Sequence, residues 1–364
     1  MRIAINARSI LLANLTGIGR YTYHLLNSLG QVDQTNTYVI HVPKRLFDFK
    51  RHLPSLPYKN FEPHVDLFKR GVGKTDIYHL PSPDTIGPYQ GKLVVTVHDL
   101  VYKTYPQSHT QETIELTEKH MQQVIKRADH IICISNRTRD DLHRFFDLPQ
   151  EKSTVVYNGV DHKQFYSMNE SEKQQAKEIL VQMGVVGPFL LFVGTIEPRK
   201  NLTGLMAAFT ALKQKKIFQG KLVVVGMKGW MTEKIYPLLK SFNIQEDVIF
   251  TGFVSDEQVR YFYNLAEVFA FPSLYEGFGF PILEAFCCGA AVVTSNTSSC
   301  EEIATDAALI INPESVEELT KGISQMLLDT KLNQAYRLKA LQRAQQFSFD
   351  KTAKETLRVY ENLI

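Results

Sequence analysis

Cysteine is scarce in this 364-residue chain, and the four that occur are spaced neither as a metal site nor as a disulfide framework. Cys287 and Cys288 are adjacent in an apolar run, whereas Cys133 and Cys300 stand alone. We therefore expect buried free thiols. An excess of one charge is also lacking, because 41 Lys and Arg residues against 38 Asp and Glu residues leave a net charge of +3. That balance argues against a nucleic-acid-binding protein.

Long hydrophobic runs are absent as well, since no segment approaches the roughly 20 apolar residues that span a bilayer. The most apolar segments, such as 189–193 and 221–226, have the length of strands. The N-terminus lacks the charged region and apolar stretch of a secretory signal. We therefore expect a cytoplasmic protein, with any membrane contact peripheral, on the inner face of the cytoplasmic membrane.

Short β-branched runs alternate with longer amphipathic segments along nearly the whole chain. This order is typical of an α/β fold with parallel sheets, in which helices connect successive strands. The pattern restarts after a polar stretch that begins at Asn169, which indicates two domains. The expected strands are 3–6, 38–41, 77–79, 93–98, 130–134 and 154–157 in the first series, and 189–193, 222–225, 248–251, 268–271, 291–295 and 308–311 in the second.

Two expected strands of the first series end in residues that could contact a ligand. The first precedes a loop with Gly17 and Gly19, ahead of a helix expected over 21–29. Glycines there let backbone amides approach an anion, but the spacing is not GxGxxG, and a plain turn remains an alternative. His98 ends the strand 93–98, where it could donate a hydrogen bond to a sugar hydroxyl or a phosphate. A structural hydrogen bond with Asp99 is the other interpretation.

The second series carries charged residues at two strand ends. The segment Gly194-Thr195-Ile196-Glu197-Pro198-Arg199-Lys200-Asn201 places two cations before a helix start, which suits a diphosphate. After the strand 268–271 the chain reads Glu276-Gly277-Phe278-Gly279-Phe280-Pro281, and Glu284 follows one turn into the next helix. The amides of Gly277, Phe278 and Gly279 would face an anion at that helix N-terminus. The two carboxylates are expected to contact different parts of one elongated ligand.

Together these residues resemble the GT-B glycosyltransferases of family GT4. Glu276 and Glu284 match the E-x7-E motif of that family, and segment 194–201 matches its G-x-x-x-x-R-K-N element. Gly17 to Tyr21, His98-Asp99, Ile134-Ser135-Asn136 and Asn158-Gly159-Val160-Asp161 match further elements in the same order. Within this family, the residues that make up these motifs are most similar to those of bacterial mannosyltransferases of O-antigen and exopolysaccharide assembly.

The resemblance implies two facing Rossmann-like domains with a cleft between them. The acceptor-binding domain would span 1–168 and the nucleotide-sugar-binding domain 169–346, with a helix over 347–364 crossing back onto the first. Arg199 and Lys200 would bind the diphosphate and Glu284 the ribose. Glu276, with the loop amides, would contact the sugar and phosphate. His98 would lie near the donor sugar, and the amide of Gly19 near the phosphate.

The resemblance also implies a retaining transfer of a hexose to a glycan or lipid-linked saccharide in cell-surface polysaccharide (lipopolysaccharide) synthesis, with GDP-mannose as the expected donor. The chain has no Asp-x-Asp, the metal-holding motif of GT-A enzymes, so we expect no metal requirement and no cofactor. A UDP-sugar (glucose, GlcNAc or galactose) as donor, a nucleotide-sugar epimerase of the same fold and a non-catalytic sugar-nucleotide-binding protein remain alternatives. Other enzymes of polysaccharide assembly are candidate partners.

The acceptor half of the chain carries two further features. Eight basic residues lie within Lys44–Lys74 against three acidic ones, interleaved with aromatics, and this segment is a candidate contact with an anionic membrane. A solvated basic face is the alternative. Tyr102 and Tyr105 follow the His98-Asp99 pair and would either stack on an acceptor sugar or pack inside the domain.

Overall fold

A computed structural model describes residues 1–11, 17–43, 53–67, 70–84, 87–227, 229 and 235–364. The described chain divides into two compact units. Unit 1 comprises Met1–Gly159 and Ser348–Ile364, and unit 2 comprises Val160–Phe347.

The division falls earlier in the chain than the expected boundary at 168, because the intervening segment is bonded to unit 2. Arg260 donates a hydrogen bond to the carbonyl of Gln164. Asn264 receives a hydrogen bond from the amide of Met168 and donates one to the carbonyl of Tyr166.

Unit 1 is built on a seven-stranded parallel sheet in the order β3-β2-β1-β4-β5-β6-β7. Its strands are β1 (Arg2–Asn6), β2 (Thr37–Pro43), β3 (Phe61–Asp66), β4 (Lys74–Leu80), β5 (Gln90–Val97), β6 (His130–Cys133) and β7 (Ser153–Val155). Its α-helices are α1 (Gly17–Val32), α2 (Val101–Thr104), α3 (Gln111–Arg127), α4 (Asn136–Phe145) and α13 (Phe349–Glu361).

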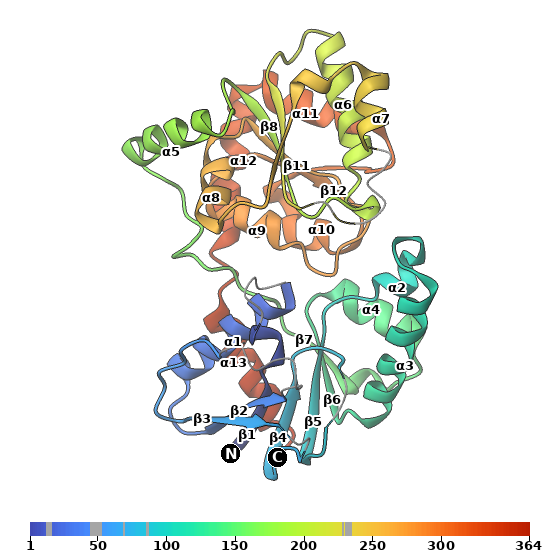
Figure 1. Cartoon of the computed structure of the whole chain (residues 1–364), viewed down its shortest axis with the longest axis vertical. Helices are drawn as coiled ribbons and strands as arrows, with labels where there is room; N and C mark the ends of the chain where they lie inside the picture. Colours follow the sequence, from blue (N-terminus) through green and yellow to red (C-terminus); the bar gives the residue numbers. More distant parts are fainter. Residues whose placement is uncertain (12–16, 44–52, 68–69, 85–86, 228, 230–234) are drawn as a thin grey trace. The chain divides into compact units, whose positions relative to one another are not determined.

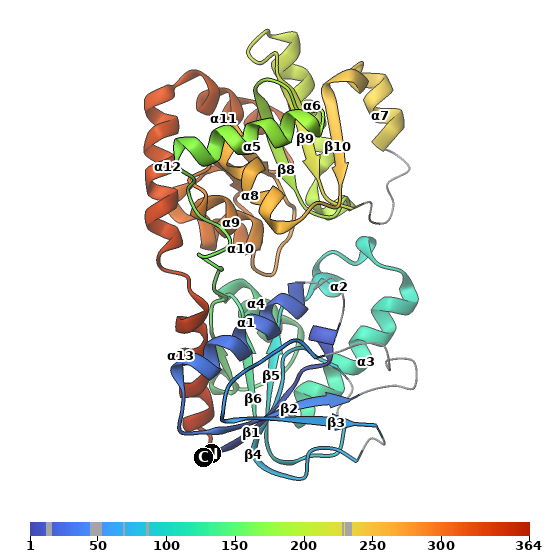
Figure 2. The same ribbon diagram turned by 60° about the vertical axis from the view of Figure 1, so that its left-hand side comes forward.

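Successive residues of a strand face opposite sides of the sheet, so both faces of unit 1 are covered. On one face Val95 and Val97 of β5 pack in a core with Met121 and Val124 of α3. On the other face α1 and α13 lie side by side, as Figures 1 and 2 both show. The last helix of the chain therefore belongs to the unit that contains the first strand.

Unit 2 has a six-stranded parallel sheet in the order β10-β9-β8-β11-β12-β13. Its strands are β8 (Phe189–Val193), β9 (Lys221–Val225), β10 (Val248–Gly252), β11 (Val268–Phe271), β12 (Val292–Ser295) and β13 (Leu309–Ile311). Its α-helices are α5 (Glu170–Gln182), α6 (Leu202–Gln214), α7 (Ile235–Phe242), α8 (Asp256–Leu265), α9 (Phe280–Cys287), α10 (Ser298–Ala304), α11 (Val316–Leu328) and α12 (Thr330–Ala344).

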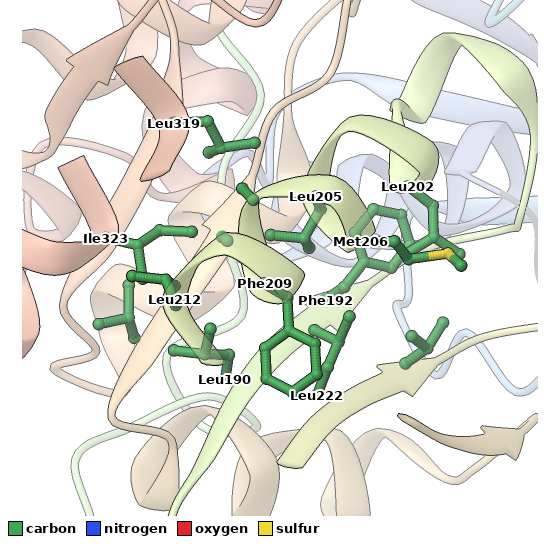
Figure 3. Close-up of a cluster of buried hydrophobic side chains, with 14 of the residues drawn as sticks. Leu190, Phe192, Leu202, Leu205, Met206, Phe209, Leu212, Leu222, Leu319 and Ile323 are labelled. Atoms are coloured by element: carbon green, nitrogen blue, oxygen red, sulfur yellow. The ribbon is translucent and has the colours of Figure 1, made fainter. Parts of the chain in front are cut away.

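The core of unit 2 explains why its strands are continuous apolar runs. Leu190 and Phe192 of β8 face a cluster formed with α6 and α11, which Figure 3 shows around Phe209. The alternate residue Phe189 instead meets Phe262 of α8 on the opposite face of the sheet. Both faces of the strands are therefore buried by helices. This confirms the expected α/β class, with two Rossmann-like sheets.

Every strand expected from the sequence forms, but one strand of the sheet in unit 1 was not expected. Strand β3 lies at the sheet edge and has four exposed residues between buried Phe61 and Asp66. It also contains Pro63, which an edge strand tolerates because one side of its backbone has no strand partner. A polar segment with a proline gives no strand signal in sequence.

The loop expected at Gly17 to Tyr21 is also different in the structure. Gly17 is the first residue of α1 that the structure describes, and Gly19 and Arg20 are helical. The expectation that the helix begins at Tyr21 is therefore wrong. Gly19 is buried within this first turn.

Three further expectations can be compared with the described residues. Of the eight basic residues in the segment Lys44–Lys74, five lie outside the described residues, in 44–52 and 68–69. The contact of this segment with an anionic membrane therefore stays a prediction. No helix among the described residues is long and apolar enough to cross a membrane. All four cysteines are free and buried, which confirms the expectation for them.

Candidate functional site

The expected donor residues of unit 2 lie where its strand order reverses. Strands β8 and β11 are neighbours in the sheet, although β9 and β10 lie between them in the chain. In open α/β sheets ligands bind outside the carboxyl ends of the strands at this position. Arg199 and Lys200 follow β8, and Glu276 follows β11.

Arg199, Lys200 and Glu276 form one buried cluster. The Nζ atom of Lys200 lies 2.6 Å from Oε1 of Glu276, and Nη1 of Arg199 lies 2.9 Å from Oε2. Lys200 and Glu276 are each 7% exposed. The Lys200 ammonium also lies 4.8 Å from the ring centroid of Phe271. The structure thus brings together three residues from two sequence motifs.

Two residues that the sequence reasoning did not single out complete the cluster. Glu197 pairs with Arg199 across 2.6 Å, and Ser273 donates a hydrogen bond of 2.7 Å to Oε1 of Glu276. The two cations and two carboxylates are therefore balanced in charge. The sequence feature that could have predicted the ion pair of Glu197 is its position two residues before Arg199. Closeness in sequence, however, does not distinguish a paired carboxylate from a solvated one.

The ionisation of Glu276 follows from these neighbours. Burial by itself raises the pKa of the Glu276 carboxyl, but the charges of Arg199 and Lys200 outweigh it and lower that pKa to about 2. The hydrogen bonds from Lys200 and Ser273 act in the same direction. Glu276 is therefore a carboxylate near neutral pH, and it accepts hydrogen bonds but has no proton to donate.

The main chain of Glu276 is held by the first two residues of α10, the helix that follows β12. The amide of Glu276 donates to Oγ of Ser298, and Oγ of Ser299 donates to the carbonyl of Glu276. Ser298 has a φ of 56°, a left-handed conformation that is uncommon for serine. Both ends of the Glu276 residue are thus fixed by contacts that no local sequence pattern indicates.

The glycine-rich loop after Glu276 leads into α9. Gly279 is the N-cap of this helix with a φ of 100°, a conformation that favours glycine, and Pro281 lies in the first turn. Gly277 and Phe278 are buried in the same loop. Glu284 lies further along α9, and its Oε2 accepts a hydrogen bond of 3.1 Å from the hydroxyl of Tyr263.

Gly194 lies at the end of β8, beside Lys200. Its φ is 147°, and a Cβ at this position would sit 3.6 Å from Cε of Lys200. Asn201 is the N-cap of α6 with a left-handed φ of 55°, and its side chain accepts a hydrogen bond from the amide of Gly204. The turn from β8 to α6 is therefore set by two residues with unusual backbone angles, with the two cations between them.

His98 directly follows β5 in unit 1, at the carboxyl end of that strand. Its Nε2 lies 2.7 Å from the carbonyl oxygen of Pro81, and because a carbonyl only accepts, we assign the ring proton to Nε2. Burial lowers the pKa of His98, although the Pro81 carbonyl opposes this effect. The neutral ring then presents Nδ1 as an acceptor, whereas the sequence predicted a donor.

For Asp99 and Tyr102 the sequence left two interpretations each, and the structure favours one of them. The carboxylate of Asp99 accepts a hydrogen bond from the amide of Val101, so the interpretation of a hydrogen bond between Asp99 and His98 is not supported. Tyr102 is 5% exposed, packs in the core of unit 1 and donates to Glu118. Tyr102 is therefore a packing residue.

Two protein-family models match this chain, and between them they span both units. The model for glycosyltransferase family 4 matches residues 16–164. The model for glycosyl transferases group 1 matches residues 184–343, which contain the cluster of Arg199, Lys200 and Glu276.

Curated relatives include two mannosyltransferases of Escherichia coli. The chain is 29% identical to O-antigen chain mannosyltransferase B, over 96% of this chain and 97% of that protein. It is 26% identical to the serotype-specific mannosyltransferase WbdA over 80% of this chain, but it spans 36% of the length of that relative.

Solved structures share the fold over almost the whole chain. A sucrose-phosphate synthase from Thermosynechococcus elongatus matches with a TM-score of 0.78 at 20% identity, covering 100% of this chain and 98% of that one. HepE from Anabaena, in complex with UDP and glucose, matches with a TM-score of 0.73 at 16% identity, covering 99% of both chains. At these identities the likeness shows the fold alone.

Proposed function

Because this chain belongs to the glycosyltransferases of family GT4, with the GT-B fold, we propose that it is a retaining hexosyltransferase that uses a nucleoside-diphosphate sugar. The proposed donor is GDP-mannose, and the proposed acceptor is a glycan or lipid-linked saccharide of a cell-surface polysaccharide. The observation that supports this function best is the buried cluster of Arg199, Lys200 and Glu276 at the reversal of strand order in unit 2.

The cluster provides the charge that a departing diphosphate requires. Among the described residues, Glu276 is the one hydrogen-bond partner of the Lys200 ammonium, which has three N–H donors. Two donors of Lys200 are therefore available to phosphate oxygens. Glu276 keeps the ammonium in place, so the positive charge is positioned before the leaving group forms. With cations in this role, no metal ion is needed in the proposed reaction.

The remaining residues of unit 2 are assigned to the other parts of the donor. Gly194 leaves space beside the Lys200 side chain, and the loop Gly277 to Gly279 leads into the positive end of α9, which favours phosphate. We assign the ribose hydroxyls to Glu284, which accepts hydrogen bonds as a carboxylate. Glu276 itself would accept from a sugar hydroxyl through the lone pair of Oε2 that Arg199 does not use, because Oε1 already accepts from Lys200 and Ser273.

In unit 1 we assign His98 to a hydroxyl of the reacting sugars. Its neutral ring offers Nδ1 as an acceptor, and such a group orients a hydroxyl without adding charge. The leaving phosphate would then take the proton of the acceptor hydroxyl, so no enzymic nucleophile is required. Gly17 and Gly19 at the start of α1 stay predicted phosphate contacts.

The choice of mannose and GDP is supported by the relatives and not by any contact in the site. Two curated relatives are mannosyltransferases, one of which matches almost the full length of this chain. A structure with the same fold, in contrast, holds UDP and glucose. A donor of the UDP-sugar class is therefore the competing candidate.

A donor panel distinguishes these candidates. Purified protein is incubated with GDP-mannose, UDP-glucose, UDP-GlcNAc, UDP-galactose, ADP-glucose and dTDP-glucose, and the released nucleoside diphosphate is measured. We expect release of GDP above all others and an α-linked product when a mannose-terminated acceptor is added. Release of UDP with no release of GDP would overturn the donor assignment. Failure to release any nucleotide would overturn the enzymatic function.

A matched pair of lysine variants tests the site itself. Lys200→Met removes the buried ammonium beside Glu276, and we expect release to fall by at least about 100-fold, the typical size of a lost charge contact at a leaving group. Lys221→Met removes an ammonium that pairs with Asp247 at the start of β9, away from the strand ends that carry the site. The control should retain full activity.

A further inference from the structure

Four buried polar side chains form a continuous hydrogen-bonded chain through unit 1. The hydroxyl of Tyr360 lies 2.6 Å from Nδ1 of His79, and Nε2 of His79 lies 2.8 Å from Oγ1 of Thr96. Thr96 is in turn 3.0 Å from the hydroxyl of Tyr21. All four residues are 0% exposed. They come from α13, β4, β5 and α1, so the chain joins both helices on this face to two neighbouring strands.

The chain ends against the ring of His98. The Tyr21 ring meets the His98 ring edge to face, with centroids 4.9 Å apart and an interplanar angle of 82°. Thr96 lies on β5, two residues before His98. His79 precedes by two residues Pro81, whose carbonyl accepts from His98 Nε2. The network therefore contacts the His98 ring through Tyr21, and its members Thr96 and His79 lie two residues before the ring and before the accepting carbonyl, respectively.

The orientation of the His98 ring determines what it offers a ligand. As the ring stands, Nε2 donates to Pro81 and Nδ1 is left as the acceptor. Rotation of the ring would break this bond, and the proton could then reside on either nitrogen. The Tyr21 ring blocks this rotation only while its own position is fixed, and its hydroxyl has Thr96 as its hydrogen-bond partner.

We propose that Tyr21, Thr96, His79 and Tyr360 are positioning residues for His98, which hold its ring so that Nδ1 faces a substrate hydroxyl as an acceptor. This proposal rests on the proposed function, because it assigns to His98 a role in sugar transfer. It gives the final helix of the chain a part in orienting that residue, through Tyr360. It also assigns a role to Tyr21, the last residue of the glycine motif at the start of α1.

The protonation states along the chain are compatible with fixed hydrogen bonds. Burial lowers the pKa of His79 to about 3, so its ring is neutral near pH 7 and has one donor and one acceptor nitrogen. Burial likewise raises the pKa of the Tyr360 and Tyr21 hydroxyls, which stay protonated. These neutral hydrogen-bonded side chains can therefore fix the orientation of a neighbouring ring, but they carry no charge to it.

The first test reads the His98 ring directly in the protein without donor or acceptor. In protein with 15N-labelled histidine, nitrogen NMR should show one tautomer of His98, with Nε2 protonated. Thr96→Val keeps the side-chain shape but removes both hydrogen bonds of the hydroxyl, and Tyr360→Phe removes the other end of the chain. We expect both variants to give a mixture of His98 tautomers, and Thr96→Ser to restore the single form.

Tyr78→Phe is the matched control. Tyr78 is 1% exposed, and its hydroxyl lies 2.9 Å from Nδ1 of His41. Because Tyr78 and His79 are successive residues of β4, the variant removes a buried tyrosine–histidine hydrogen bond of the same kind on the opposite face of the sheet. We expect it to leave the His98 signals unchanged. If Thr96→Val and Tyr360→Phe leave them equally unchanged, the proposal is wrong.

The second test measures steady-state transfer in the same variants. We expect kcat to fall roughly tenfold in Thr96→Val, the rate equivalent of one lost orienting hydrogen bond, with donor KM unchanged. Tyr78→Phe should keep the wild-type kcat. An equal loss of kcat in Thr96→Val and Tyr78→Phe would indicate a general loss of stability and overturn the positioning role. The NMR result does not depend on turnover, so a protein without transferase activity would contradict the proposed function separately.

Discussion

Two opposing electrostatic effects act on Glu276, because burial disfavours its charge and two neighbouring cations favour it. It is 7% exposed, and its carboxylate lies within 3 Å of both Arg199 and Lys200. A buried charge without a partner is costly, whereas removal of one partner of a buried pair leaves the other uncompensated. The Glu276 carboxylate is therefore needed to keep the Lys200 ammonium in the interior, whereas Arg199 has Glu197 as a second partner.

We predict that Glu276→Gln destabilises the protein in a pH-dependent way. The folded-state pKa of about 2 lies below the usual 4.5, so the stabilising effect is complete above pH 4.5 and is lost as pH falls through 2. Urea unfolding at neutral pH should show a loss of about 3 kcal/mol for the variant. The difference from wild type should shrink as the pH is lowered from 4.5 toward 2.

The control for this prediction is an exposed carboxylate of the same unit. The Glu170 side chain is 90% exposed and pairs with Lys173 on the surface of α5. Glu170→Gln should change the unfolding free energy by less than about 1 kcal/mol. A loss in Glu276→Gln that stays constant with pH would contradict the charge pairing as its cause.

At the scale of the element, the start of α6 links helix capping to the position of the two cations. Asn201 caps α6 from a left-handed conformation, and its amide also donates to the carbonyl of Pro313. The preceding turn Pro198–Lys200 is a 3-10 helix that carries Arg199 and Lys200. A change at this cap therefore reaches the site as well as the helix.

We predict that Asn201→Ala has two effects that a simple loss of cap would not combine. The unfolding free energy should fall by about 1–2 kcal/mol, because the helix loses its cap and alanine disfavours the left-handed angle. Binding of the donor nucleotide, measured by calorimetry, should weaken at least about fivefold. That factor corresponds to a loss of about 1 kcal/mol of binding free energy when the cations are displaced.

Asn169→Ala provides the comparison, because Asn169 caps α5 through a capping box. This variant should show a similar loss of stability with unchanged nucleotide affinity. If both variants bind the nucleotide equally well, the prediction that the cap of α6 positions the two cations is wrong. Asn201→Gly, which tolerates the left-handed angle, should recover part of the lost affinity.

At the scale of the whole molecule, unit 1 is assembled from two distant parts of the chain. Gly159 touches the return of the chain so closely that a Cβ would lie 2.1 Å from the amide nitrogen of Phe349. Thr352 donates a hydrogen bond to the carbonyl of Tyr157. Helix α13 buries Val359 and Tyr360 in unit 1, although unit 2 intervenes in the sequence.

We predict that a chain truncated after Phe347 destabilises unit 1 and leaves unit 2 intact. The truncation exposes the apolar surface that α13 covers, at about 1.5–3 kcal/mol for each large buried side chain. Hydrogen exchange should accelerate in β1 and β4 and stay slow in β8 and β9. A chain that ends at Glu361 retains α13 and should behave as wild type. Equal acceleration in both units would contradict the division.

Much of the fold follows from patterns that span only a few residues. The buried strands were predictable because their apolar runs are continuous, as in Phe189–Val193, and Ser255 and Asn201 mark helix starts through their capping chemistry. Strand β3 was missed because its middle residues are exposed. The first turn of α1 was missed because Gly17 and Gly19 favour loops in a local view.

The sequence by itself determined the α/β class, the two series of strands and the motifs at strand ends, because hydrophobic period and turn chemistry are local properties of the chain. Only the tertiary structure decided that Lys200 pairs with Glu276, 76 residues away, and that the His98 proton faces Pro81. The structure also assigns α13 to unit 1, as the family resemblance had implied. These contacts depend on the order of strands in each sheet, which brings together residues that no spacing in the sequence relates.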